Sequence, residues 1–129
     1  MAHVLFIDDD VDTLNTLKKA VELFGHQALL ASDGLEALQQ IEQEQVDLII
    51  TDLRLMDNSD VGIIPLLRSH PVAVKIPIVV HSAGSEAEYE KKVLAAGAQF
   101  FVSKPIRLQI LLGLINRYSP PPDTIQPGR

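Results

Sequence analysis

The chain has 129 residues, the size of one ordinary domain, and its balance of 47% hydrophobic to 22% charged residues is typical of a folded globular domain. It has no cysteine, which excludes disulfides, thiolate zinc sites and thiol nucleophiles, and its net charge of −6 argues against direct binding of nucleic acid. No apolar run approaches the roughly 18 residues of a membrane span, and "MAHVLFIDDD" lacks the features of a signal peptide. We therefore expect a cytoplasmic domain with no membrane contact.

Short apolar runs alternate along the chain with longer segments of helical period. The strand-length runs are HVLFI (3–7), QALLA (27–31), DLIIT (47–51), IPIVVH (76–81) and AQFFV (98–102). Helical faces are indicated by Leu14, Leu17, Val21 and Phe24, by Leu35, Leu38 and Ile41, by Tyr89 and Val93, and by Leu108, Leu111, Leu112 and Ile115. Gly25 and Gly97 are expected to end the first and fourth helices, and Pro65 delays the start of the third to residues 62–64.

This alternation predicts an α/β fold. Several strands are apolar on both faces, as in a parallel sheet that helices cover on each side, and right-handed crossovers then give a doubly wound sheet. The segment SPPPDTIQPGR (119–129) has four prolines and no periodic apolar face. We therefore expect one domain over residues 1–118 and a Pro-rich linker or disordered tail over 119–129.

Polar residues follow four of the five predicted strands at the point where each strand ends. Asp8 and Asp9 follow the first strand, Asp52 the third, Ser82 the fourth and Lys104 the fifth. Ligands of open α/β sheets bind outside the carboxyl ends of the strands, so these side chains are expected to meet at one edge. Carboxylates suit a hard cation such as Mg²⁺, and an aspartate can accept a phosphoryl group whose oxygens a lysine and a hydroxyl contact.

The acidic stretch FIDDDVDTL (6–14) is expected to divide between two uses. Asp8 and Asp9 face the crevice, whereas Asp10 and Asp12 lie in the turn and first helical turn, where negative charge suits the helix dipole. A calcium-binding EF-hand is excluded, because its sixth and twelfth positions would be Thr13 and Lys19 in place of Gly and Glu. A haloacid-dehalogenase-like phosphatase is disfavoured, because the chain has no room for a cap domain.

The motifs at the strand ends resemble those of a known family. The pair "DD" (8–9), the lone Asp52, "SA" (82–83) and "KP" (104–105) stand in the order and spacing of a response-regulator receiver domain of two-component signalling. The resemblance covers about residues 3–118. It implies a flavodoxin-like fold, a five-stranded sheet in the order 2-1-3-4-5 flanked by five helices.

The resemblance also implies a role for each site residue. Asp52 would be the phosphoacceptor, Ser82 and Lys104 would contact the phosphoryl group, and Phe101 would be an aromatic switch that moves with Ser82.

The metal would be Mg²⁺, with Mn²⁺ as a substitute. Asp52 and Asp9 would bind it directly, Asp8 through water, and Arg54 through its main-chain carbonyl. His81, beside the site, is expected to be a wall residue with no catalytic part.

The implied function is a signalling switch, not an enzyme acting on a separate substrate. The domain would take a phosphoryl group from a histidine kinase or phosphotransfer protein and then hydrolyse it. An output domain or a second copy would meet the face made by helix 4, strand 5 and helix 5. Loop 53–62 departs from the family pattern at Met56 and Asp60. A receiver that binds partners without being phosphorylated is the alternative.

Overall fold

The computed structural model describes residues 1–52, 63–83 and 87–120. Within them the chain forms a five-stranded parallel sheet in the order β2-β1-β3-β4-β5. The strands are β1 (His3–Ile7), β2 (Gln27–Ala31), β3 (Leu48–Thr51), β4 (Ile78–Ser82) and β5 (Phe100–Ser103). The helices are α1 (Val11–Leu23), α2 (Gly34–Gln43), α3 (Ile64–Arg68), the short 3-10 helix η1 (Ala73–Lys75), α4 (Ala87–Ala96) and α5 (Leu108–Tyr118). The predicted doubly wound fold and strand order are confirmed.

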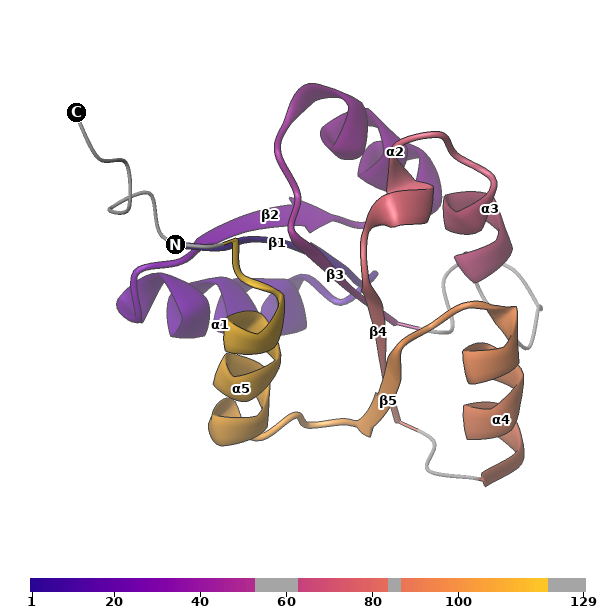
Figure 1. The fold of residues 1–129 in the computed structure, drawn as a ribbon. Coiled ribbons are helices and arrows are strands. Elements are labelled where there is room, and N and C mark those ends of the chain that lie inside the picture. The colour runs from indigo at the N-terminus through magenta and orange to yellow at the C-terminus, as the bar shows by residue number, and fades with distance from the viewer. Residues whose placement is uncertain (53–62, 84–86, 121–129) are drawn as a thin grey trace, which may run out of the picture.

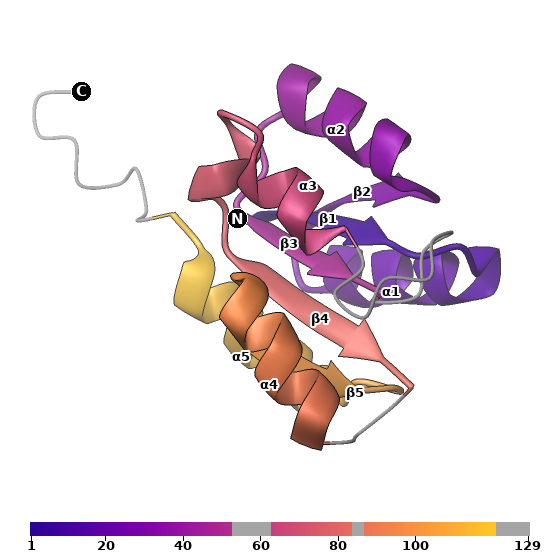
Figure 2. The same ribbon diagram turned by 90° about the vertical axis from the view of Figure 1, so that its right-hand side faces the viewer.

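Helices cover both faces of the sheet (Figures 1 and 2). On one face α1 and α5 pack through Leu14, Val21, Leu111 and Ile115 against a cluster that includes Phe6. On the other face α2, α3 and α4 pack against a second cluster. Because both faces are covered, every residue of β3 and β4 is buried, which explains why these strands are continuous apolar runs rather than alternating ones.

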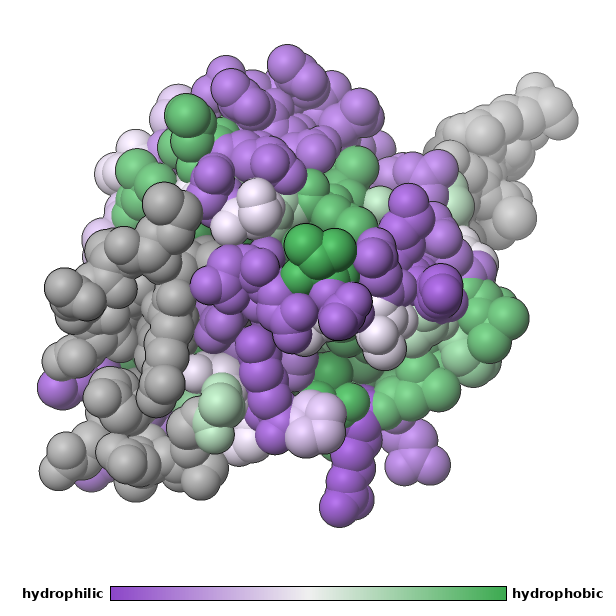
Figure 3. Space-filling view, turned by 180° about the vertical axis from the view of Figure 1, so that it is seen from behind, coloured by the Kyte–Doolittle hydropathy of each residue, from purple (hydrophilic) through white to green (hydrophobic). Residues whose placement is uncertain are grey.

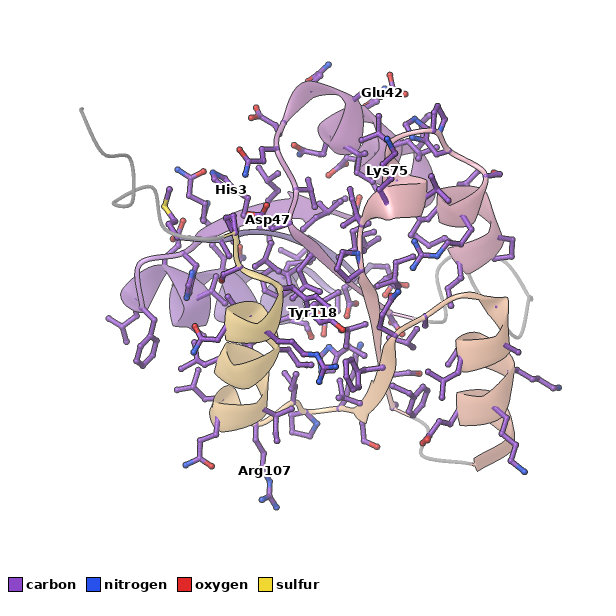
Figure 4. All side chains as sticks on the ribbon, viewed as in Figure 1. His3, Glu42, Asp47, Lys75, Arg107 and Tyr118 are labelled. Carbon is purple, nitrogen blue, oxygen red and sulfur yellow. The ribbon has the colours of Figure 1, made fainter. Side chains whose placement is uncertain are left out.

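Three strands differ from their predicted bounds by one or two residues. β3 begins at Leu48 rather than at Asp47, whose carboxylate accepts the main-chain N–H of His3 at 2.8 Å and contacts its ring at 3.3 Å (Figure 4). β4 begins at Ile78 because Pro77 has no N–H to donate, and it extends to Ser82. β5 runs from Phe100 to Ser103, so both strands end one residue later than predicted.

The helix boundaries follow their capping residues. Asp10 and Asp33 cap α1 and α2 by accepting main-chain N–H groups of the first turns. Gly25 and Gly97 adopt φ of 85° and 123° after α1 and α4, which confirms both predicted helix ends. α3 begins at Ile64 with Pro65 in its first turn, as predicted.

The predicted helical faces were partly wrong at their ends. Phe24, Leu35 and Leu108 are exposed, at 49%, 69% and 43% of their surfaces. In α2, Ala37 and Ile41 are buried and the predicted Leu38 packs against the core cluster, whereas Leu35 points outward. The apolar period thus located the helices but not the edge of each buried stripe.

Arg68 joins several elements at the amino ends of β4 and β5. Its guanidinium donates to the carbonyls of Gly97 at 2.6 and 3.0 Å, of Ala73 at 3.3 Å, of Val74 at 3.1 Å and of Ile76 at 2.9 Å. It also donates to the side-chain oxygen of Gln99 at 3.1 Å. A Cβ at Gly97 would lie 2.9 Å from Nε of Arg68, so this contact also requires glycine there. One side chain therefore ties α3, η1 and the starts of two strands together.

The surface is mostly hydrophilic when seen from behind, with apolar side chains gathered in patches between the polar ones (Figure 3). Among the described residues, no helix has the length and apolar character that crossing a membrane would take.

Candidate functional site

Three carboxylates meet at the carboxyl edge of the sheet. Oxygen atoms of Asp8, Asp9 and Asp52 all lie within 4.8 Å of one another. Asp8 and Asp52 are buried, at 2% and 8% exposure, whereas Asp9 is exposed. The structure therefore brings together the acidic residues that the sequence placed at the ends of the first and third strands.

The backbone places Asp8 and Asp52 by extending the sheet hydrogen bonds one residue beyond the strands. The N–H of Asp8 donates to Ala31 at 3.0 Å, and the N–H of Asp52 donates to Ile7 at 2.8 Å. One carboxylate oxygen of Asp8 also accepts the N–H of Asp10 at 2.9 Å, which fixes its orientation. These side chains are therefore held by the regular sheet and not by a separate loop.

Lys104 supplies the positive charge at this edge. Its Nζ donates to Asp8 at 2.8 Å and to Asp52 at 3.2 Å. Burial alone would lower the pKa of Lys104, but the hydrogen bond to Asp8 and the attraction of Asp52 together raise that pKa above its usual value. The ammonium is therefore charged at neutral pH and bridges two of the three carboxylates.

The connection after β5 is anchored on the end of β4. The N–H of Lys104 donates to the carbonyl of Ser82 at 2.8 Å, and the Lys104–Pro105 peptide bond is cis. Ser82, the last residue of β4, is 2% exposed and lies opposite Ser103. Its hydroxyl thus belongs to the same edge as Lys104, as the sequence predicted.

For two other predicted residues, Phe101 and Arg54, the structure does not test the expected role. Phe101 lies on β5 opposite Val80, is half-buried, and packs against the core cluster on the side of α2, α3 and α4. This position is compatible with a core role, and the switch role stays a prediction. Arg54, with the rest of loop 53–62, lies outside the described residues.

The acidic stretch divides as predicted. Asp10 is the N-cap of α1, where its carboxylate accepts the N–H of Asp12 at 3.1 Å and the hydroxyl of Thr13 at 2.8 Å. The hydrogen bond from Thr13 lowers the pKa of Asp10. Asp12 is exposed in the first helical turn. These two carboxylates therefore stabilise the start of α1, and neither belongs to the group of three at the edge of the sheet.

His81, expected only to line the site, is buried and hydrogen-bonded to the backbone. It is 4% exposed, and its Nε2 accepts the N–H of Ile106 at 3.2 Å. Burial, reinforced by the charge of Lys104, lowers the pKa of His81 to about 4. A histidine between Val80 and Ser82 carries no sequence signal for this bond, because its partner is 25 residues away.

The charges at the site are unbalanced in a way that favours a divalent cation. Asp8, Asp9 and Asp52 bring three negative charges, and Lys104 neutralises one of them. Mg²⁺ prefers carboxylate oxygens and neutralises the remainder, so the residues present fit such an ion. The same set of groups, a carboxylate nucleophile beside an ammonium, suits phosphoryl transfer.

Comparison with known proteins identifies the family. The family model described as the response regulator receiver domain matches residues 4–116 of this chain. This chain belongs to that family. Receiver domains are signalling domains that interact with histidine kinases or phosphotransfer proteins and bind Mg²⁺ in an acidic pocket.

Curated relatives are longer than this chain. It is 33% identical over 120 residues to hybrid signal transduction histidine kinase G of Dictyostelium discoideum, covering 91% of this chain and 4% of that protein. It is also 33% identical over 112 residues to the transcriptional regulatory protein KdpE of Mycobacterium tuberculosis, covering 87% of this chain and 48% of that one. The chain thus spans at most about half the length of either relative.

Solved structures share the fold. A two-component response regulator from Clostridium difficile superposes with a TM-score of 0.82 and 26% identity, over 92% of this chain and 95% of that one. The receiver domain of sensor histidine kinase PA1611 from Pseudomonas aeruginosa gives a TM-score of 0.78 at 20% identity, over 91% and 96%. That structure has a magnesium ion coordinated in its active site cleft.

Proposed function

We propose that this chain is a phosphoacceptor switch in which Asp52 receives a phosphoryl group from a histidine kinase or a histidine phosphotransfer protein and later loses it by hydrolysis. The observation that carries the proposal is the bridge from Lys104 to Asp8 and Asp52, beside a third carboxylate. A bridge of this kind is expected where an incoming phosphoryl group will need a cation. The same contact, at 3.2 Å from Nζ of Lys104, holds the acceptor carboxylate in place before transfer.

The chemistry needs few steps. A carboxylate oxygen of Asp52 attacks phosphorus, the phosphorus–nitrogen bond to the donor imidazole breaks, and the imidazole leaves with the electron pair. Lys104 and the hydroxyl of Ser82 hold oxygens of the transferred group, whose charge they stabilise. In the reverse direction of the switch, water attacks phosphorus, and the bond to Asp52 breaks to release inorganic phosphate and restore the carboxylate.

The metal fits the same residues. Asp8, Asp9 and Asp52 would hold Mg²⁺ or Mn²⁺, with the main-chain carbonyl of Arg54 as a further predicted ligand. When bound, the ion neutralises negative charge on the phosphoryl oxygens. The magnesium ion in the PA1611 receiver domain supports this assignment by analogy of fold.

The output is expected on the face formed by α4, β5 and α5. Phosphorylation would shift a pre-existing equilibrium between inactive and active forms, with Ser82 and Phe101 as the moving residues. On this face Cζ of Arg117 lies 5.0 Å from the ring centroid of Phe100 and 5.8 Å from that of Tyr118. A second copy or an output domain would bind to this face. A cytoplasmic location goes with such partners.

The proposal is tested with acetyl phosphate as a small phosphodonor. Incubated with Mg²⁺, the chain should gain the mass of one phosphoryl group, and Asp52→Asn should gain none. Glu22→Gln, an exposed carboxylate change on α1, is the matched control and should behave like the unmutated chain. If the unmutated chain gains no mass, the phosphoacceptor proposal fails and a receiver that binds without phosphorylation takes its place.

A further inference from the structure

A cavity of about 260 Å³ lies between α1 and the connection from β5 to α5. Its apolar walls are Leu17, Pro105 and Ile106. Polar groups on α1 line it as well, and the buried ring of His81 completes it. None of these residues takes part in the proposed phosphoryl chemistry, so the cavity is a separate feature of the molecule.

His81 carries a hydrogen-bond donor that has no partner among the described residues. Its Nε2 accepts the N–H of Ile106, so the neutral ring must carry its proton on Nδ1. Nδ1 makes no hydrogen bond to any described residue, although the side chain is 4% exposed. No fully enclosed side-chain nitrogen or oxygen lacks a partner within the described ranges. Nδ1 therefore has some accessible surface, and His81 is one of the residues that line the cavity.

The lining restricts the chemistry of an occupant. The Nδ1–H of His81, which has no partner among the described residues, favours an occupant with an oxygen acceptor. The apolar walls favour a hydrocarbon body, and the carboxylate of Asp12 at the cavity disfavours an anion. The volume lies just below the roughly 300 Å³ at which pockets for drug-sized ligands begin, so the occupant is small.

We propose that this cavity binds a small neutral molecule with an apolar body and one oxygen acceptor, such as a phenol or a ketone, which accepts a hydrogen bond from Nδ1 of His81. The site adjoins the proposed phosphoacceptor site without sharing its residues. The N–H of Ile106 donates to Nε2 of His81, and Ile106 is two positions after Lys104 in the chain. The inference rests on the cavity and the imidazole, and it stands whether or not Asp52 is phosphorylated.

The test compares two probes of the same shape, 4-methylphenol and toluene, by heteronuclear NMR titration of the full chain. We expect saturable shifts of the amides of Thr16, Leu17 and Ile106, with a dissociation constant for 4-methylphenol on the order of 1 mM. The Nδ1–H signal of His81 should move with 4-methylphenol and not with toluene. Shifts that do not saturate, or that spread over the whole surface, would overturn the proposal.

Two variants sharpen the test. His81→Leu replaces the imidazole with an apolar side chain of similar size, and the preference for 4-methylphenol over toluene should fall by roughly tenfold, the value of one hydrogen bond. Comparing the ratio of the two probes cancels their different solvation in water. An unchanged ratio would exclude His81 as the donor.

Thr16→Phe leaves His81 in place and fills the cavity from the exposed surface of α1, so it should abolish binding of both probes. Glu22→Gln, on the same helix but outside the cavity, is the control and should bind both as the unmutated chain does. Retained binding in a folded Thr16→Phe variant would place the probes elsewhere and overturn the proposal. This arm remains decisive even if His81→Leu does not fold.

Discussion

The two ends of the sheet each have a cation that joins several elements, but the partners of the two cations differ. At the amino ends of β4 and β5, the partners of Arg68 among the described residues are neutral oxygens, four carbonyls and one amide. At the carboxyl edge, Lys104 bridges the carboxylates of Asp8 and Asp52. The planar guanidinium of Arg68 has its donors in fixed directions and is held by main-chain oxygens that do not move. The ammonium of Lys104 is at the end of a flexible side chain and can turn toward a new anion. We infer that Arg68 stabilises the fold and that Lys104 serves the chemistry.

The largest expected effect is on the rate of phosphorylation in Lys104→Met. Removing the ammonium removes a donor to the transferred group, and we expect the rate with acetyl phosphate and Mg²⁺ to fall roughly 100- to 1,000-fold. Intact mass as a function of time measures it. Lys75→Met removes an exposed lysine of η1 and should leave the rate unchanged. If the rate of Lys104→Met stays within a few-fold of that of the unmutated chain, Lys104 does not serve the chemistry and does not differ from Arg68 in this respect.

The same variant separates charge balance from rate. Without Lys104 the buried carboxylates repel each other, so Lys104→Met should also unfold at lower urea concentration. Mg²⁺ should restore much of that stability because it replaces the lost positive charge, yet it should not restore the rate. Urea unfolding with and without Mg²⁺ measures the first effect.

The next effect concerns Arg68→Met, which should lower the free energy of unfolding by about 3 kcal/mol, because several charge-assisted hydrogen bonds are lost together. Urea denaturation followed by circular dichroism measures this. Under conditions where the variant is folded, its phosphorylation rate should match that of the unmutated chain. Arg107→Met is the control, since Arg107 is exposed and makes no side-chain cap for α5. Equal stability of the two variants would show that the Arg68 contacts contribute little.

The sequence sufficed to predict the carboxyl edge because its residues directly follow regular strands. Asp8, Asp52, Ser82 and Lys104 each stand at or just after the end of an apolar run, and a parallel sheet brings such ends to one side. Asp10 was equally predictable, because capping depends on the few residues that follow it. Local pattern and fold class together thus predicted where these residues lie.

The amino end could not be predicted in the same way. Arg68 is a charged residue in a helix of five residues, and its partners lie five to 31 positions away, mostly on main-chain oxygens that any sequence supplies. The 3-10 helix η1, which brings three of those carbonyls near, has no distinct sequence pattern either. His81 is similar, since its bond to Ile106 depends on tertiary packing. Contacts to the backbone leave little trace in the sequence.

The smallest of these effects uses pH to separate the two ends again. The pKa of His81 falls from the ordinary 6.5 to about 4 on folding, mainly because the ring is buried, so the unfolded chain binds more protons between these values. The stability contributed by the neutral ring is complete above pH 6.5 and is lost as the pH falls toward 4. At pH 5 the free energy of unfolding should already be lower by about 2 kcal/mol than at neutral pH.

His81→Gln keeps an oxygen that can accept the N–H of Ile106 but does not titrate, so its unfolding free energy should depend less on pH between 6.5 and 5. Arg68→Met should instead be less stable by the same amount across this range, because a guanidinium stays protonated throughout. Urea unfolding at several pH values measures both. If His81→Gln keeps the full acid dependence, the acid sensitivity comes from groups other than His81, and the difference between the two ends would rest on Lys104 alone.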